Sequence, residues 1–152
     1  MSNAIALDSN ILIYASSKGF EKHNEAKMLV DKVFSGGLEA ALCAQNLNEF
    51  IATVTNSKKM SNPLKLGDAV NEASKLVNTG FELLNPNDKT WQTFELIVKQ
   101  KPKYKGQLIY DLFLAATLIS NGVDTLITEN VKDFEGIKGF KAMEIGELKY
   151  GT

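Results

Sequence analysis

Short apolar runs and longer segments with helical periodicity alternate along the whole chain. Runs this short predict buried strands, whereas apolar residues three or four positions apart predict amphipathic helices. Strands that alternate with helices leave few topologies open, and they predict a three-layer α/β/α domain with a mainly parallel central sheet. The predicted strands are residues 5–7, 40–44, 81–84, 125–128 and 141–145.

Helical periodicity is found between these strands. Segment 109–120 is apolar on nearly all sides, which predicts a central helix covered by several neighbours. In two other segments the spacing defines an apolar face that should turn inward. These faces consist of Leu66, Val70, Ala73 and Val77 in one segment and of Trp91, Phe94, Ile97 and Val98 in the other. The predicted helices start near Ile11 and cover 21–34, 47–54, the stretch from 66 to the stop at Gly80, 91–98 and 109–120.

Size and composition are those of an ordinary globular domain. The chain has 152 residues, of which 44% are hydrophobic and 23% charged, so we expect a single domain over residues 1–152. No apolar run approaches the roughly 20 residues of a membrane span, and the N-terminus lacks the order of a signal peptide. The expected location is therefore the cytoplasm.

The charge balance excludes a global electrostatic attraction to nucleic acid. The formal net charge is -1, and all 17 basic residues are lysines, so the chain has no guanidinium group for bidentate anion binding. Lysines stand at every second position from 99 to 105, with Pro102 and Tyr104 between them. This segment is either a solvated loop or a local site for phosphate groups.

Several kinds of catalytic site are excluded by what the chain lacks. Its one cysteine, Cys43, lies in an apolar run and is predicted to be a core residue, and its one histidine, His23, is predicted to be solvated. Paired-histidine chemistry, disulfides and a typical zinc site are thereby excluded. No glycine-rich phosphate loop or serine nucleophile motif occurs either.

Carboxylates remain as the candidates for chemistry. Asp8 directly follows the first predicted strand, and Asp111 is the one charged residue at the start of the apolar segment 109–120. The carboxyl ends of parallel strands meet at one edge of the sheet, where ligands bind. Carboxylates gathered there would hold a hard divalent cation suited to phosphoryl chemistry. The alternatives are that Asp8 only caps the next helix and that Asp111 is an exposed acid near a helix start.

Four stretches of the chain together resemble the PIN-domain nucleases, and within them the VapC-like toxins of type II toxin-antitoxin pairs. Each stretch is a weak signal alone, but their order and spacing are fairly specific. The resemblance implies the same α/β/α fold. The stretches are residues 5–14, 46–50, 110–117 and 126–134.

The resemblance implies that Asp8, Glu49 and Asp111 are catalytic and bind Mg2+ or Mn2+. Helical periodicity alone gives no reason to choose Glu49, because it lies opposite the apolar face that contains Leu47 and Phe50. Only the resemblance assigns it to the site.

The fourth acidic position of the family falls on Asn130, with Asp133 three residues later. Both are candidate metal ligands, and an amide at this position would weaken binding of a second ion. Thr128 corresponds to a supporting hydroxyl, and Asn10 to a polar partner of Asp8.

The implied reaction is hydrolysis of RNA phosphodiester bonds, with an antitoxin protein and a second copy of the chain as partners. Lys101, Lys103 and Lys105 would then contact RNA phosphates. Three alternatives stay open: a PIN nuclease of RNA processing, a phosphoacceptor signalling domain, and a catalytically weak RNA- or partner-binding module. The last is favoured by Asn130 at an acidic position.

Overall fold

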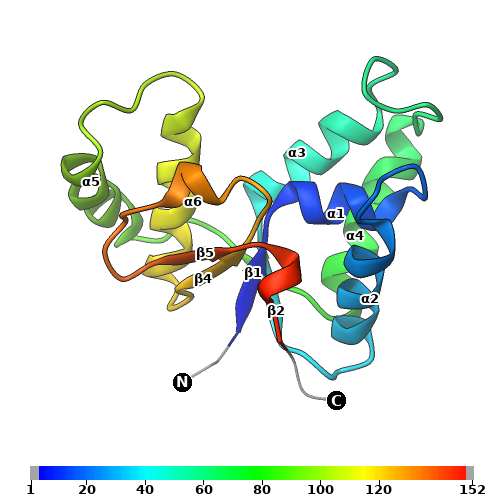
Figure 1. Ribbon diagram of the computed structural model, residues 1–152, viewed down its shortest axis with the longest axis horizontal. Helices are drawn as coiled ribbons and strands as arrows, with labels where there is room; N and C mark the ends of the chain where they lie inside the picture. The colour runs from blue at the N-terminus through cyan, green and yellow to red at the C-terminus, as the bar shows by residue number, and fades with distance from the viewer. Residues whose placement is uncertain (1–3, 150–152) are drawn as a thin grey trace.

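The computed structural model describes residues 4–149, and at its centre lies a parallel sheet of five strands in the order β3-β2-β1-β4-β5 (Figure 1). The predicted fold class is confirmed. The predicted domain limits, residues 1 and 152, lie outside the described residues. The strands are β1 (Ile5–Leu7), β2 (Ala40–Cys43), β3 (Glu82–Leu84), β4 (Thr125–Ile127) and β5 (Lys141–Met143).

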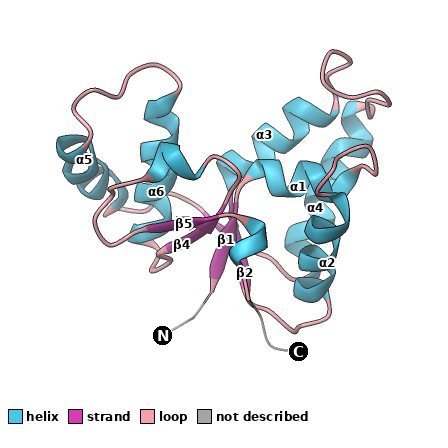
Figure 2. Cartoon of the chain, viewed as in Figure 1, coloured by secondary structure: helices cyan, strands magenta, loops and turns pink. Residues whose placement is uncertain are grey.

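Helices cover both faces of this sheet, as Figure 2 shows. One face is covered by α1 (Ser9–Ser16), α2 (His23–Phe34), α3 (Ala44–Val54) and α4 (Leu66–Thr79), and the other by α5 (Thr90–Gln100) and α6 (Leu108–Ser120). Two short 3-10 helices follow β4 and β5, namely η1 (Val131–Phe134) and η2 (Ile145–Glu147).

Side chains of the central strand alternate between two cores. Ile5 and Leu7 pack with the α1–α4 side, whereas Ala6 packs with the α5–α6 side. Ala6 is in register with Ala41 on one neighbour and Leu126 on the other. Both faces of β1 are therefore buried, which explains why this strand is apolar without a polar alternate.

The predicted inward faces of two helices are only partly confirmed: Ala73 on α4 and Ile97 on α5 are buried as predicted, but other members of each face are not. In α4, Leu66 and Val70 are 65% and 42% exposed, because the helix packs through Ala69 and Ala73, whose small side chains allow close contact. In α5, Trp91 is 61% exposed. Several apolar residues were available for each face, and only packing decides which of them is buried.

The burial of Cys43 and of His23 can be compared with the sequence predictions for these two residues. Cys43 is buried, as predicted, and burial raises the pKa of its thiol to about 12. His23 is half-buried rather than solvated, because its Nδ1 lies 2.8 Å from the carbonyl oxygen of Tyr14. Within residues 4–149, no helix has the length and hydropathy needed to cross a membrane.

Candidate active site

The carboxyl ends of β1, β2 and β4 bring distant parts of the chain to one edge of the sheet (Figure 1). Asp8 follows β1, and Thr128 follows β4. The Thr128 hydroxyl donates a hydrogen bond of 2.7 Å to Oδ2 of Asp8, across 120 residues of sequence. This contact defines the centre of the candidate site.

Asp8 is held by both of its carboxylate oxygens. Oδ1 accepts a 2.8 Å hydrogen bond from the amide of Ser9, so Asp8 is the N-cap of α1, as one sequence interpretation predicts. Its own amide donates to the carbonyl oxygen of Ile127 at 2.9 Å and so continues the sheet. Asp8 is only 6% exposed, and the cap and a place in the candidate site coexist.

Asn46 is a site residue that sequence reasoning did not identify. It is fully buried in the first turn of α3, where Oδ1 accepts from the amide of Cys43 at 2.9 Å. Its Nδ2 donates to Oδ1 of Asp8 at 3.3 Å. An asparagine at the third position of a helix that follows a buried strand was the available signal, because such a side chain commonly caps the helix.

Thr128 and Asn10 form one network with Asp8. The fully buried Thr128 hydroxyl accepts from the Asn10 side chain at 3.4 Å and from the amide of Asn130 at 3.0 Å. Asn10 Oδ1 in turn accepts from the amide of Glu129 at 3.4 Å. Asn130 thus reaches the network through its main chain, while its side chain is exposed and makes no hydrogen bond within the described residues.

Asp111 lies in the first turn of α6 and is half-buried. Burial, and then the charges of Asp133, Asp8 and Glu49, raise its pKa to about 7. The alternative of a fully exposed acid near a helix start is therefore wrong. Burial also raises the pKa of Asp8, and this effect outweighs the hydrogen bonds from Thr128 and Ser9 that lower it.

Glu49 is exposed, as its position on α3 predicts, but it lies close enough to Asp8 and Asp111 to interact with their charges. Partial desolvation in the cleft and the charge of Asp8 raise its pKa. Gln45, one turn earlier, donates a 3.4 Å hydrogen bond to Oε1 of Glu49. The tertiary structure thus brings Glu49 into the electrostatic field of Asp8 and Asp111.

Asp133 supplies the fourth negative charge of the site. It lies on η1, and its charge raises the pKa of Asp8, Asp111 and Tyr104. The Tyr104 hydroxyl donates a 2.8 Å hydrogen bond to the carbonyl oxygen of Asp133. Of the two candidates for the fourth position, Asp133 is electrostatically coupled to the site, whereas Asn130 adds no charge.

The oxygen atoms of these four carboxylates are the type of ligand that a hard divalent cation prefers. Asp8, Glu49, Asp111 and Asp133 offer only oxygen ligands. Burial, and then repulsion from neighbouring carboxylates of this group, raises the pKa of Asp8, Glu49 and Asp111. A cation would relieve this repulsion. Within residues 4–149 no three side chains of His, Cys, Asp or Glu converge on one point, so the carboxylates have to draw together to hold an ion.

The lysine-rich segment borders this site. Lys101 lies over the ring of Tyr104, with Nζ 5.5 Å from the ring centroid, and Tyr104 contacts Asp133 as described above. Lys103 and Lys105 are exposed. The segment is therefore solvated, and it also lies beside the carboxylates, so both sequence interpretations of it remain.

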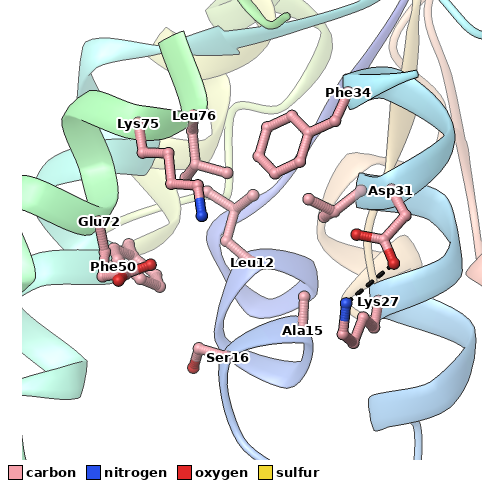
Figure 3. A pocket seen from close by; sticks show the side chains of 11 residues that line it. Leu12, Ala15, Ser16, Lys27, Asp31, Phe34, Phe50, Glu72, Lys75 and Leu76 are labelled. Carbon is pink, nitrogen blue, oxygen red and sulfur yellow. Dashed lines mark hydrogen bonds and ion pairs between the residues drawn. The ribbon is translucent and has the colours of Figure 1, made fainter. Parts of the chain in front are cut away.

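A separate pocket of about 230 Å3 lies between α1, α2 and α4 (Figure 3). Leu12, Phe34 and Leu76 line it, and the Lys27–Asp31 ion pair lies on its wall. None of the four carboxylates described above borders this pocket. The pocket is therefore distinct from the candidate active site.

Comparison with known proteins agrees with this architecture. The family model described as "PIN domain" matches residues 5–139. Ribonuclease VapC24 of Mycobacterium tuberculosis is 24% identical over 134 residues, which cover 86% of this chain and 88% of the relative.

Two solved structures share the fold. VapBC2 from Rickettsia felis, bound to a DNA fragment from its promoter, has a TM-score of 0.63 at 21% identity and covers 93% of this chain and 98% of its own. A toxin-antitoxin complex from Klebsiella pneumoniae has a TM-score of 0.58 at 22% identity, with 95% of this chain and 100% of its own covered.

Proposed function

The chain belongs to the PIN domain family, and from this we propose that it is a divalent-metal-dependent endoribonuclease that hydrolyses RNA phosphodiester bonds. The observation that carries the proposal is the group of four coupled carboxylates at the carboxyl edge of the sheet. A relative named as a ribonuclease, matched over most of both chains, supports the choice of substrate.

In this proposal Asp8, Glu49 and Asp111 are the catalytic residues, and together with Asp133 they hold Mg2+ or Mn2+. A bound ion supplies positive charge that offsets the negative charge developing on the phosphate and makes water a better nucleophile. Asn130, with its exposed amide, is the weaker candidate ligand because it contributes no charge.

Asn46, Thr128 and Asn10 are positioning residues in this proposal. Asn46 and Thr128 each donate to a different oxygen of Asp8, and they fix the plane of its carboxylate. Asn10 holds the Thr128 hydroxyl and the main chain after β4. A preorganised carboxylate loses less entropy when it binds an ion, which favours binding.

The biological role we propose is that of the toxin in a toxin-antitoxin pair. A solved structure with the same fold is a toxin-antitoxin complex, and 95% of this chain aligns with it. A small antitoxin protein would be the partner, and a homodimer and a cytoplasmic location belong to the same proposal. An RNA-processing nuclease of the same family is the alternative.

The proposal has one further competitor. The carboxylates do not converge on a ready-made ion site among the described residues, and this favours a weakly catalytic binding module. The phosphoacceptor alternative is set aside, because the chain belongs to the PIN domain family.

RNA cleavage by the purified protein tests the proposal. Structured and single-stranded RNAs are incubated with Mg2+, Mn2+ or EDTA, using the parent, Asp8→Asn, Asp111→Asn and the control Asp68→Asn. Asp68 is an exposed acid in the first turn of α4, so the control makes the same chemical change at a comparable helix position. We expect cleavage only with a divalent ion, a loss of at least about 100-fold in the two site variants, and no loss in the control.

Two results would reject the proposal. Equal cleavage by the parent and both site variants would mean that the carboxylates do not carry the reaction. A folded parent that binds RNA but cleaves none of it with either ion would establish the binding module instead.

A further inference from the structure

A cleft of about 600 Å3 opens beside the carboxylates, between the start of α3 and the start of α6. Its volume lies within the range of roughly 300–1,000 Å3 that is typical of ligand sites. Glu49 borders both the cleft and the acidic group, so the two are continuous. The side chains that matter below are Gln45, Asn48 and Glu49 from α3, and Gln107, Tyr110 and Phe113 from α6.

The walls of this cleft combine an aromatic surface with unpaired amides. Tyr110 is 60% exposed, and Phe113 is braced from behind by Phe94, with ring centroids 5.4 Å apart in an edge-on contact. The side chains of Asn48 and Gln107 are exposed and make no hydrogen bond within the part of the chain that the structure describes. Aromatic faces stack on planar ligands, and free amides offer a donor and an acceptor side by side.

Gln45 holds the two walls together. Its Nε2 donates to the carbonyl oxygen of Tyr110 at 3.2 Å, and to Oε1 of Glu49 at 3.4 Å. This bridge joins α3 to α6 directly. The cleft is therefore a defined space rather than a gap between two independent helices.

The charges select the kind of ligand that fits. Among the described residues no lysine lines the cleft, and the one charged side chain there is the carboxylate of Glu49. A phosphate would be repelled there, whereas a neutral planar ring with polar edges would satisfy the amides. The lysine-rich segment that contains Lys101, Lys103 and Lys105 approaches the acidic group through Tyr104 instead.

We propose that this cleft binds one unpaired nucleobase of the RNA, next to the bond that is cut. Tyr110 stacks on the base, while Asn48 and Gln107 bind its edge and so determine which base is accepted. Amide side chains recognise base edges in this way, and single-stranded RNA exposes bases that can leave the stack. The inference rests on the proposed ribonuclease function and adds a specificity site to it.

Cut-site sequencing with a randomised single-stranded RNA tests the inference. The variants are Tyr110→Leu and the double variant Asn48→Ala with Gln107→Ala; all three positions are exposed, so folding is expected to be unaffected. The control is Trp91→Leu, which makes the same kind of change at 61% exposure and outside the cleft. We expect the parent and the control to prefer one base beside the cut.

The two variants should differ from each other. Loss of stacking in Tyr110→Leu should raise KM about tenfold and leave kcat nearly unchanged. Loss of the amides in the double variant should abolish the base preference while cleavage continues. If the parent cleaves RNA and both variants keep its KM and its cut sites, the nucleobase proposal is wrong, although the ribonuclease proposal stands.

A binding measurement tests the nucleobase site independently of RNA cleavage. In an Asp111→Asn background, fluorescence anisotropy is measured with single-stranded and with fully duplex RNA of the same sequence. We expect the single strand to bind more tightly, and addition of Tyr110→Leu to remove about tenfold of that affinity. Equal affinity with and without Tyr110→Leu would overturn the nucleobase site, even if the parent cleaved no RNA at all.

Discussion

The carboxylate of Asp8 shows how burial and hydrogen bonding compete at a single residue. Its oxygens accept from Ser9, Asn46 and Thr128, and each of these bonds favours the charged form. Burial nevertheless raises the pKa of Asp8. The residue is thus held in place firmly, while its charge remains costly until a cation compensates it.

The variant Thr128→Val tests whether the Thr128 hydroxyl holds the carboxylate of Asp8 in place. Valine fills the same space but leaves Oδ2 of Asp8 without a donor and the amide of Asn130 without an acceptor. We expect the free energy of unfolding to fall by about 1–3 kcal/mol, measured by urea denaturation, and cleavage to fall as well. Thr128→Ser retains the hydroxyl and should be close to the parent; a Val variant as stable as the Ser variant would contradict the assignment.

Asp111 predicts a pH dependence of stability in the absence of divalent ions. Its folded pKa is about 7, above the ordinary 3.8, because of burial and the charges of Asp133, Asp8 and Glu49. The folded state therefore binds the proton more tightly than the unfolded state, and stability falls as the pH rises from about 4 to 7.

The measurement is urea unfolding in EDTA at pH 5 and pH 8. Between these values the parent should lose on the order of 1–2 kcal/mol more than Asp111→Asn, since solvent screens part of the shift of this half-buried group. Burial raises the pKa of Asp8 as well, so Asp8 contributes with the same sign in both proteins. Parallel pH profiles for the two proteins would rule out a raised pKa at Asp111.

At the scale of elements, the segment between α5 and α6 joins a basic loop to the acidic site. Tyr104 connects them, because its hydroxyl donates to the carbonyl oxygen of Asp133 on η1 and its ring lies under Lys101. The prediction that this segment lies near the start of α6 follows from the sequence alone. The contact of this segment with η1 cannot be predicted from the sequence alone, because the two segments are distant in sequence and only the tertiary structure brings them together.

Replacing Lys101, Lys103 and Lys105 by glutamine tests whether this segment binds RNA phosphates. Affinity should fall, and the slope of log K against log salt should decrease by about 2 if all three contact phosphates, as expected for single strands. A matched control replaces Lys58, Lys59 and Lys65, which are exposed lysines between α3 and α4. An unchanged slope in the first triple variant would leave the segment as a merely solvated loop.

At the scale of the whole molecule, the parallel sheet concentrates negative charge. The four carboxylates come from the end of β1, from α3, from the start of α6 and from η1, and they lie near one another only because the carboxyl ends of the strands share one edge. The Lys27–Asp31 ion pair lies on α2, away from this group, whereas the lysine-rich segment borders it through Tyr104.

Divalent ions should therefore stabilise the folded protein. At an Mn2+ concentration 100 times its Kd, the expected gain is about 2.7 kcal/mol, because the ion binds the folded state alone. That gain corresponds to a rise of roughly 5–10 °C in Tm for a domain of this size. Calorimetry should show the rise in the parent and in Asp68→Asn but little of it in Asp8→Asn; an equal rise in all three would point to binding elsewhere.

Local spacing was sufficient to predict the fold class, the five strands and the helices, with differences of a few residues at their ends. It also identified Asp8 and Asp111 as candidates, because a carboxylate beside a buried apolar segment is costly without a compensating partner. Strands and helices depend on residues that are close in sequence, and backbone geometry alone determines which residues share a face of an element.

Contacts between distant segments had to be decided by packing. Periodicity gave no role to Asn46, and the resemblance placed the fourth acidic position on Asn130 with Asp133 close behind, whereas the fold joins Asn46 to Asp8 and brings the charge of Asp133 near Asp111. Trp91, predicted to face inward, is exposed. In each case the local pattern permits several arrangements of similar energy, and the arrangement that buries the most apolar surface without unpaired polar groups selects one.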